Sequence, residues 1–195
     1  MEQLVIVAHP VENSFTMRLA RAYTDELEKL GHTQRTCDLY RMRFNPVLIA
    51  HEWMPVSAGH PAGADVAKAQ DEIRAADVLT MFYLLWWISM PAMMKGYVDR
   101  VFARGFAYES SQGIVHGLHG GEKALMVTCS GAPLPLLVKS GNWNAMEVLQ
   151  ETHIFRSAGF ELIEHLHFDE IVPFLTEAVA AQHMERIRAC ARQHF

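Results

Sequence analysis

Two adjacent tryptophans, Trp86 and Trp87, are the residues best suited to hold a flat ligand. They follow an apolar run and precede Ser89 and Pro91, residue types that commonly stand at the start of a helix. Large aromatic side chains beside the free N–H groups of a helix start would bind a flat, electron-poor ring. Adjacent residues of a strand point to opposite sides, so at most one of the two would face a ligand if the strand extends that far. Burial in the core explains the pair equally well.

A second group of candidate residues lies near the N-terminus, between an apolar run and a helix-like pattern. Asn13, Ser14 and Thr16 supply an amide and two hydroxyls there, whereas His9 is expected to be a loop histidine bonded to backbone rather than a metal ligand. Such groups, with free backbone N–H donors at a helix N-terminus, can hold a phosphate. Ser14 would equally serve only as the helix cap. The segment contains neither GxGxxG nor a P-loop lysine, which argues against the common dinucleotide and nucleoside-triphosphate loops.

Other kinds of chemistry find little support. The three cysteines are scattered, odd in number and without a CxxC pair, so we expect neither a disulfide framework nor a metal site. Ser130 and Gly131 follow an apolar run, but the GxSxG elbow of hydrolases is absent. His116 and His119 lie in a glycine-rich segment, where they would either reach a site or belong to a solvated loop.

Five apolar or alternating runs predict strands, separated by segments with helical periodicity. From Met90 to Phe102 the apolar positions recur at i, i+3, i+4 and i+7, which predicts a helix with Ser89 as its N-cap. The predicted strands are 4–8, 33–39, 77–84, 123–129 and 160–167, and the predicted helices are 15–30, 65–75, 90–102, 142–157 and 173–193. The segments 40–63, 107–121 and 132–141 are predicted to be loops.

Alternating strands and helices predict an α/β fold with one domain over residues 1–195. We expect a flavodoxin-like three-layer sandwich, in which helices cover both faces of a five-stranded parallel sheet of order 2-1-3-4-5. The loops 9–16, 84–90 and 129–136 all follow strands, so they lie at the same edge of the sheet. The ligand crevice of such a sheet opens between the ends of the first and third strands.

The composition and the N-terminal sequence indicate which partners and which cellular compartment to expect. A net charge of −5 argues against nonspecific binding of nucleic acid, which needs a basic face. No apolar run approaches the roughly 18 residues of a membrane span. The N-terminus reads directly into a strand and lacks a signal-peptide pattern, so we expect a cytoplasmic protein.

At these residues the chain resembles the NAD(P)H:quinone oxidoreductase family of flavodoxin-like flavoproteins. That family includes quinone reductases, enzymes of the modulator-of-drug-activity type, and ancillary subunits of glutathione-gated potassium efflux systems. The segments that carry the resemblance are 6–15, 38–40 with 44–46, 86–102, 105–108, 128–131 and 157–160.

The resemblance implies a bound FMN or FAD, and the short chain favours FMN. In the family, three loops surround the flavin and a tyrosine crosses the homodimer interface. His9, Asn13, Ser14, Phe15 and Thr16 match the phosphate loop; Leu84, Leu85, Trp86, Trp87 and Ile88 match the stretch along the isoalloxazine ring; Thr128, Ser130 and Gly131 match the loop at its pyrimidine end; and Tyr108 matches the donated tyrosine. Tyr108 and Trp87 are therefore the candidate catalytic residues.

The activity implied by the resemblance is a ping-pong transfer of two electrons. NADPH or NADH passes a hydride to the flavin and leaves, and a quinone or similar electrophile then accepts the electrons. The tyrosine and histidine that assist this step in animal quinone reductases have no match in 132–143. Two alternatives remain: a flavin-binding ancillary subunit docked on a membrane potassium efflux transporter, and a one-electron carrier like flavodoxin, for which the mild charge is unusual.

Overall fold

The centre of the molecule is a parallel sheet of five strands in the order β2-β1-β3-β6-β7. The computed structural model describes residues 1–195. The strands are β1 (Glu2–Ala8), β2 (Thr33–Asp38), β3 (Val78–Leu84), β6 (Lys123–Cys129) and β7 (Glu161–Phe168). The predicted flavodoxin-like sheet of order 2-1-3-4-5 is confirmed, and β2 and β7 form its edges.

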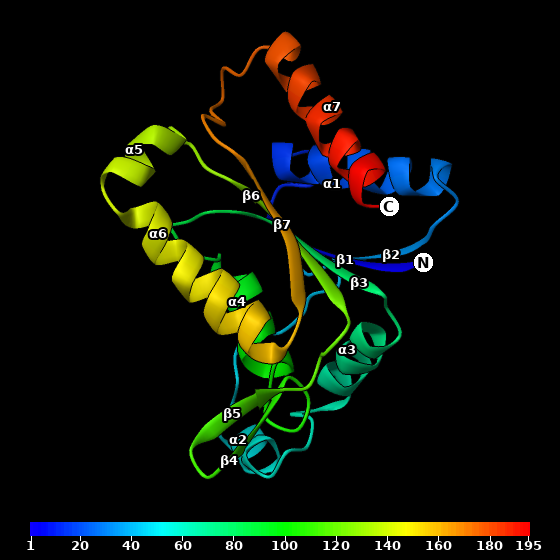
Figure 1. Cartoon of the computed structure of the whole chain (residues 1–195), viewed down its shortest axis with the longest axis vertical. Coiled ribbons are helices and arrows are strands. Elements are labelled where there is room, and N and C mark those ends of the chain that lie inside the picture. Colours follow the sequence, from blue (N-terminus) through cyan, green and yellow to red (C-terminus); the bar gives the residue numbers. More distant parts are fainter.

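Helices cover both faces of this sheet (Figure 1). One face carries α1 (Phe15–Lys29) and α7 (Glu177–His194), which lie side by side. The other face carries α3 (Ala64–Arg74), α4 (Ala92–Val101) and α6 (Asn142–Glu147), the last continued by a π-helical stretch, η1 (Val148–Arg156). None of the helices is both long and apolar enough to cross a membrane.

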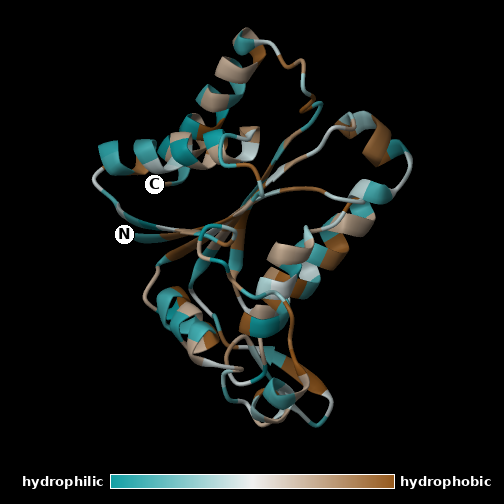
Figure 2. Cartoon of the chain, turned by 180° about the vertical axis from the view of Figure 1, so that it is seen from behind, coloured by the Kyte–Doolittle hydropathy of each residue, from teal (hydrophilic) through white to brown (hydrophobic).

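The central strands are apolar along their whole length because both of their faces are buried. In β1, Leu4 and Ile6 belong to the core under α3 and α4, whereas Val5 and Val7 belong to the core under α1 and α7. A strand covered on both sides has no solvent-facing positions, so its sequence does not alternate. In Figure 2, α1 and α7 instead mix hydrophilic and hydrophobic residues, as expected for helices with one buried side.

Three segments that the sequence predicted as loops contain regular structure. The first holds α2 (Ala50–Ser57), and the second holds an antiparallel hairpin of β4 (Tyr108–Ser111) and β5 (Ile114–Gly117). The third holds α5 (Leu134–Lys139), whose two prolines stand at its start, where a missing N–H costs no helical hydrogen bond. In the hairpin, Gln112 and Gly113 both have positive φ and form a two-residue turn.

Two predicted helix starts are displaced. The helix predicted to follow Ser89 begins at Ala92 with Pro91 as N-cap, because Ser89 pairs with Trp86 in a tight turn. The last helix begins only at Glu177, where the Thr176 hydroxyl accepts a hydrogen bond from the N–H of Val179 at 3.4 Å.

One buried arginine fastens the 45–65 region to α4. Arg100 donates hydrogen bonds to Glu52 at 2.7 Å, to Asp65 at 2.6 Å and to the carbonyl of Asn45 at 2.7 Å. One turn earlier Gly96 lies under Pro46, whose carbonyl would stand 2.2 Å from any added Cβ. Helix α4, which starts beside the Trp86–Ser89 turn, is thereby fixed against the rest of the fold.

Replacing Arg100 by alanine is expected to lower the free energy of unfolding by about 3 kcal/mol or more, because the Glu52 carboxylate stays buried without its partner. Urea denaturation followed by tryptophan fluorescence measures this. Lys95→Ala, which breaks an exposed pair with Asp99 on the same helix, is the control and should cost less than about 0.5 kcal/mol. Equal losses in the two variants would contradict the anchoring role.

The same pair predicts a dependence on pH. Burial alone would raise the pKa of Glu52, but its hydrogen bonds with Arg100 and the Ile49 N–H and the charge of Arg100 lower the pKa overall. A depressed folded-state pKa stabilises the protein above the ordinary value of 4.5, and this contribution is lost as the pH falls below it. The difference between wild type and Arg100→Ala should therefore shrink from pH 7 to pH 3.

Candidate functional site

Three loops meet at the carboxyl edge of the sheet, where the sequence places the ligand crevice. They follow β1, β3 and β6, which are neighbours in the sheet. The N–H of Leu85 donates to the carbonyl of Cys129 at 2.8 Å, so the second and third loops leave the sheet side by side. The structure thus brings together the residues predicted in 9–16, 84–90 and 129–136.

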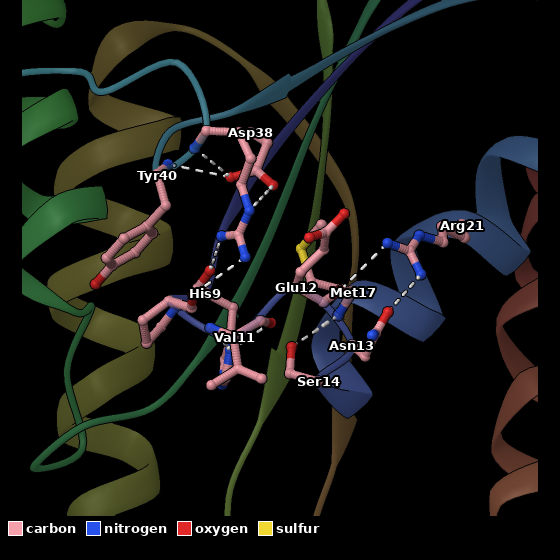
Figure 3. Close-up of polar contacts among 11 residues, drawn as sticks. His9, Val11, Glu12, Asn13, Ser14, Met17, Arg21, Asp38 and Tyr40 are labelled. Carbon is pink, nitrogen blue, oxygen red and sulfur yellow. Dashed lines mark hydrogen bonds and ion pairs between the residues drawn. The ribbon is translucent and has the colours of Figure 1, made fainter.

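The first loop is held by arginines that bind its carbonyl groups (Figure 3). Arg41 donates to the carbonyls of His9 at 2.9 Å and Pro10 at 3.1 Å, and Arg21 donates to that of Glu12 at 3.2 Å. The His9 Nδ1 accepts from the N–H of Val11 at 3.1 Å. Burial is the main cause that lowers the pKa of His9, which favours the neutral ring that this acceptor role requires. The arginines thus fix the path of the loop, within which the N–H groups of Val11 and Ser14 are bonded as well.

Helix α1 begins directly after this loop with several unpaired donors. The Ser14 hydroxyl accepts from the N–H of Met17 at 3.3 Å, so the predicted cap is confirmed. The backbone N–H groups of Asn13, Phe15 and Thr16 donate to no acceptor within the chain. Such donors, with the positive end of the helix dipole, form an anion site.

The side chains of two predicted residues in this region point into the protein. Phe15 packs edge-on against His183, with ring centroids 5.7 Å apart, and Thr16 is fully buried. Their contribution to an anion site would come from the backbone N–H groups alone.

The second loop is a tight turn in a conformation that its residues rarely adopt. Trp86 and Ser89 exchange backbone hydrogen bonds of 3.0 and 3.1 Å, and the two residues between them, Trp87 and Ile88, have φ of +53° and +59°. Two consecutive positive φ values define the type I′ turn, which favours Asn-Gly. For a tryptophan and a β-branched isoleucine this conformation costs of order 1 kcal/mol or more each.

This turn presents Trp87 to solvent. The Trp87 side chain is 99% exposed and that of Trp86 is 48% exposed, so core packing is excluded for Trp87. The N–H groups of Trp87 and Ile88 donate to no acceptor in the chain. Leu84, Leu85 and Ile88 pack largely inward against the two cores. A strained, exposed aromatic turn with free donors is a feature of binding sites rather than of stable scaffolds.

The third loop is backed by two histidines that the sequence analysis missed. Thr128 is fully buried, and its hydroxyl lies 2.7 Å from His165 Nε2 and 2.7 Å from His167 Nδ1. Ser130 is also buried and donates to the carbonyl of Ala132 at 2.7 Å, whereas Gly131 is exposed. The i, i+2 spacing of the histidines on a predicted strand was the signal that places both on one face.

Tyr108 lies away from these loops. It belongs to the hairpin, which lies at the opposite end of the sheet from α5 (Figure 1); directly after the hairpin, the His119 N–H donates to the Ala158 carbonyl in the segment between η1 and β7. Within one chain, Tyr108 and Trp87 therefore do not share a site.

Within one chain, neither His116 nor His119 reaches the three loops. His119 is buried and stacks on Phe160 with centroids 4.4 Å apart, so it is not part of a solvated loop either. His116 is exposed on the hairpin, opposite Glu109.

Comparison with known proteins agrees with the observed fold. The family model for the flavodoxin-like fold matches residues 1–191. An uncharacterized NAD(P)H oxidoreductase of Haemophilus influenzae is 31% identical over 172 residues, covering 88% of this chain and 85% of that protein. The structure of an NAD(P)H:quinone oxidoreductase from Methanothermobacter marburgensis superimposes with a TM-score of 0.89 at 27% identity, covering 100% of this chain and 98% of the other.

An FMN-dependent NADH-azoreductase from Bacillus anthracis, solved in complex with FMN, shares the fold with a TM-score of 0.77 at 14% identity over 98% of each chain. The chain belongs to the flavodoxin-like fold family, and within it to the relatives of the NAD(P)H oxidoreductases. It is an oxidoreductase.

The strained turn leads to a stability prediction. Trp87→Asn is expected to raise the free energy of unfolding by about 1 kcal/mol, because asparagine tolerates positive φ and the exposed indole makes no packing to lose. Urea denaturation of the cofactor-free protein measures the change. Trp53→Asn in α2, also exposed but with ordinary φ, should bring no gain. An unchanged or lower stability for Trp87→Asn would show that the turn stores no strain.

Proposed function

We propose that residues 1–195 form one flavin-binding domain that transfers two electrons from NADPH or NADH to a quinone or a similar electrophile by a ping-pong mechanism. The observation that carries this proposal is the juxtaposition, at one sheet edge, of unpaired N–H donors at the start of α1 with the exposed tryptophan turn after β3. The first suits a phosphate, and the second suits a flat ring.

The residues present fit FMN. The N–H groups of Phe15 and Thr16, beside Ser14, would hold the single phosphate, and the free N–H groups of Trp87 and Ile88 would donate to ring carbonyls. Trp86 and Trp87 would supply the apolar surface along the ring, and Gly131 would lie beside its pyrimidine end. When bound, the flavin accepts a hydride from the nicotinamide and passes two electrons to the acceptor. FAD would use the same phosphate donors, and FMN is favoured because one phosphate satisfies them.

The proposal includes a homodimer, because Tyr108 can join the site only from another copy of the chain. Tyr108 lines an apolar groove of about 510 Å³ between α4, the hairpin and η1, together with Val98, Phe102 and Ile154. Exposed apolar residues also mark the carboxyl edge, where α5 shows hydrophobic colour in Figure 2 and Leu136 and Val138 are each 57% exposed. Sedimentation velocity tests this: a monomer of 22.1 kDa with full quinone turnover would remove Tyr108 from the site.

The first experiment is an absorbance spectrum of the purified protein under anaerobic conditions. We expect flavin bands that bleach in one two-electron step on addition of NADPH or NADH and return on addition of a quinone. Mass spectrometry of the released cofactor distinguishes FMN from FAD. A protein without flavin bands that binds no added FMN or FAD would disprove the proposal.

Ser14→Asp separates phosphate binding from helix capping. Aspartate caps a helix as well as serine does, so the free energy of unfolding should change by less than about 0.5 kcal/mol. Its charge would repel the phosphate, and FMN affinity, measured by quenching of flavin fluorescence, should fall at least about tenfold. Thr176→Asp, the equivalent change at the cap of α7, should leave FMN affinity unchanged. If Ser14→Asp retained normal FMN affinity, the phosphate would not lie at α1.

A further inference from the structure

A continuous row of hydrogen bonds runs behind the third loop from η1 to Ser130. Glu151 Oε1 lies 2.8 Å from His165 Nδ1, and His165 Nε2 lies 2.7 Å from the Thr128 hydroxyl. That hydroxyl lies 2.7 Å from His167 Nδ1, and His167 Nε2 lies 3.0 Å from the Ser130 hydroxyl. The row ends where Ser130 donates to the Ala132 carbonyl at 2.7 Å.

The row is shielded from water on most of its length. Thr128, Ser130 and His167 are buried, and the side chains of His165 and Glu151 are 6% and 15% exposed. Trp143 covers the histidines, stacked on His165 with ring centroids 5.0 Å apart and tilted against His167 at 4.8 Å. Buried polar groups of this kind must be hydrogen-bonded throughout, so the position of every proton in the row is constrained.

Counting protons shows which arrangement makes all five contacts. The Ser130 hydroxyl has one proton, which it uses in its hydrogen bond to the Ala132 carbonyl. It can therefore only accept from His167, so His167 donates from Nε2 and, as a neutral ring, accepts at Nδ1. Thr128 must then donate to His167 and accept from His165 Nε2. Because His165 also faces the Glu151 carboxylate with Nδ1, both of its nitrogens carry protons, and its positive charge is balanced by Glu151. The fully bonded row therefore holds one extra proton, on His165.

Removing that proton reverses the direction of the hydrogen bonds between His165 and Ser130 without moving any heavy atom. If the Ser130 proton leaves, His167 protonates Ser130 from Nε2, Thr128 protonates His167 at Nδ1, and His165 protonates Thr128 from Nε2. The neutral His165 that remains still donates from Nδ1 to Glu151, and Ser130 now donates to His167 instead of Ala132. The two forms differ by one proton and by the tautomer of His167.

We propose that these five residues, Glu151, His165, Thr128, His167 and Ser130, are a one-proton store that ends at Ser130, in the third loop of the candidate site. The inference rests on the proposed function, since reducing a quinone to a hydroquinone takes one hydride and one proton. The hydride comes from the nicotinamide by way of the flavin, and the store supplies the proton to the reduced oxygen. The five residues position and carry that proton rather than react with the substrate.

The charged groups around the row agree with this assignment. Burial, followed by the charge of His165, lowers the pKa of His167 to about 4, which agrees with His167 as the neutral ring of the row. The other charged groups close to the row are Arg156 on η1, which pairs with Glu151, Glu147 on α6, which accepts from Trp143, and Asp169 after β7 and Arg186 on α7. Arg186 donates to the His167 carbonyl at 2.9 Å and also disfavours a charge on that ring.

The test is a nitrogen NMR titration of the whole protein labelled with ¹⁵N-histidine, with resonances assigned from His165→Gln and His167→Gln. We expect His167 to switch from the Nε2–H to the Nδ1–H tautomer at the same pH at which His165 loses its charge. Thr128→Val should abolish this coupling and Thr128→Ser should retain it. Thr80→Val, which removes a fully buried hydroxyl from the neighbouring strand, is the matched control and should behave as wild type.

A His167 tautomer that stays constant in the wild type while His165 titrates would overturn the store, and so would coupling that survives in Thr128→Val. The wild-type titration alone tests the proton store if Thr128→Val does not fold. This readout does not depend on electron transfer, so a failed flavin test and a failed store are distinguishable.

Delivery of the proton is tested with a pH indicator in weak buffer during quinone reduction by the reduced protein. Uptake of protons from solvent should lag behind quinone reduction in wild type and Thr80→Val, and should coincide with it in Thr128→Val. Simultaneous uptake in the wild type would show that Ser130 does not deliver the proton.

Discussion

The structure depends on the parallel hydrogen-bond ladder that joins β1, β3 and β6. These strands pair in register from Gln3 with Val78 to Leu84 with Cys129, and their side chains enter one core or the other. A sheet buried on both faces leaves no room on them for a ligand. Exposed chemistry is therefore confined to the strand ends, and the helices that return the chain fix which loops lie at the carboxyl edge.

The same arrangement explains why the protein tolerates a strained turn at that edge. The chain must leave β3, expose an aromatic surface and enter α4 within a few residues, and Trp87 and Ile88 take positive φ to do so. The turn is held at one end by the β3–β6 pairing. At the other end, α4 is fixed by Arg100 and by the contact of Gly96 with Pro46. The strain in the turn is thus offset by packing and hydrogen bonds elsewhere in the fold.

Buried polar groups on β6 and β7 are a second constraint, because each of them needs a hydrogen-bond partner inside the protein. Thr128, His165 and His167 would each destabilise an apolar core if left unpaired, yet together with Glu151 and Ser130 they satisfy one another. Such a row is possible only because the parallel pairing of β6 and β7 places Thr128 opposite His167.

By itself the sequence determined the sheet and its order, because long apolar runs, helical periods and glycine stops are local signals of burial and chain direction. It also determined which loops meet, since parallel strands end at one edge. It did not reveal α2, α5 or the hairpin, where prolines and glycines that usually mark loops were absorbed into short elements. Only the tertiary structure decided that Trp87 faces solvent, that Tyr108 lies at the far end of the chain's own sheet, and that His165 and His167 join Thr128. These outcomes depend on turn geometry and on pairing between distant strands, which no local pattern of residues encodes.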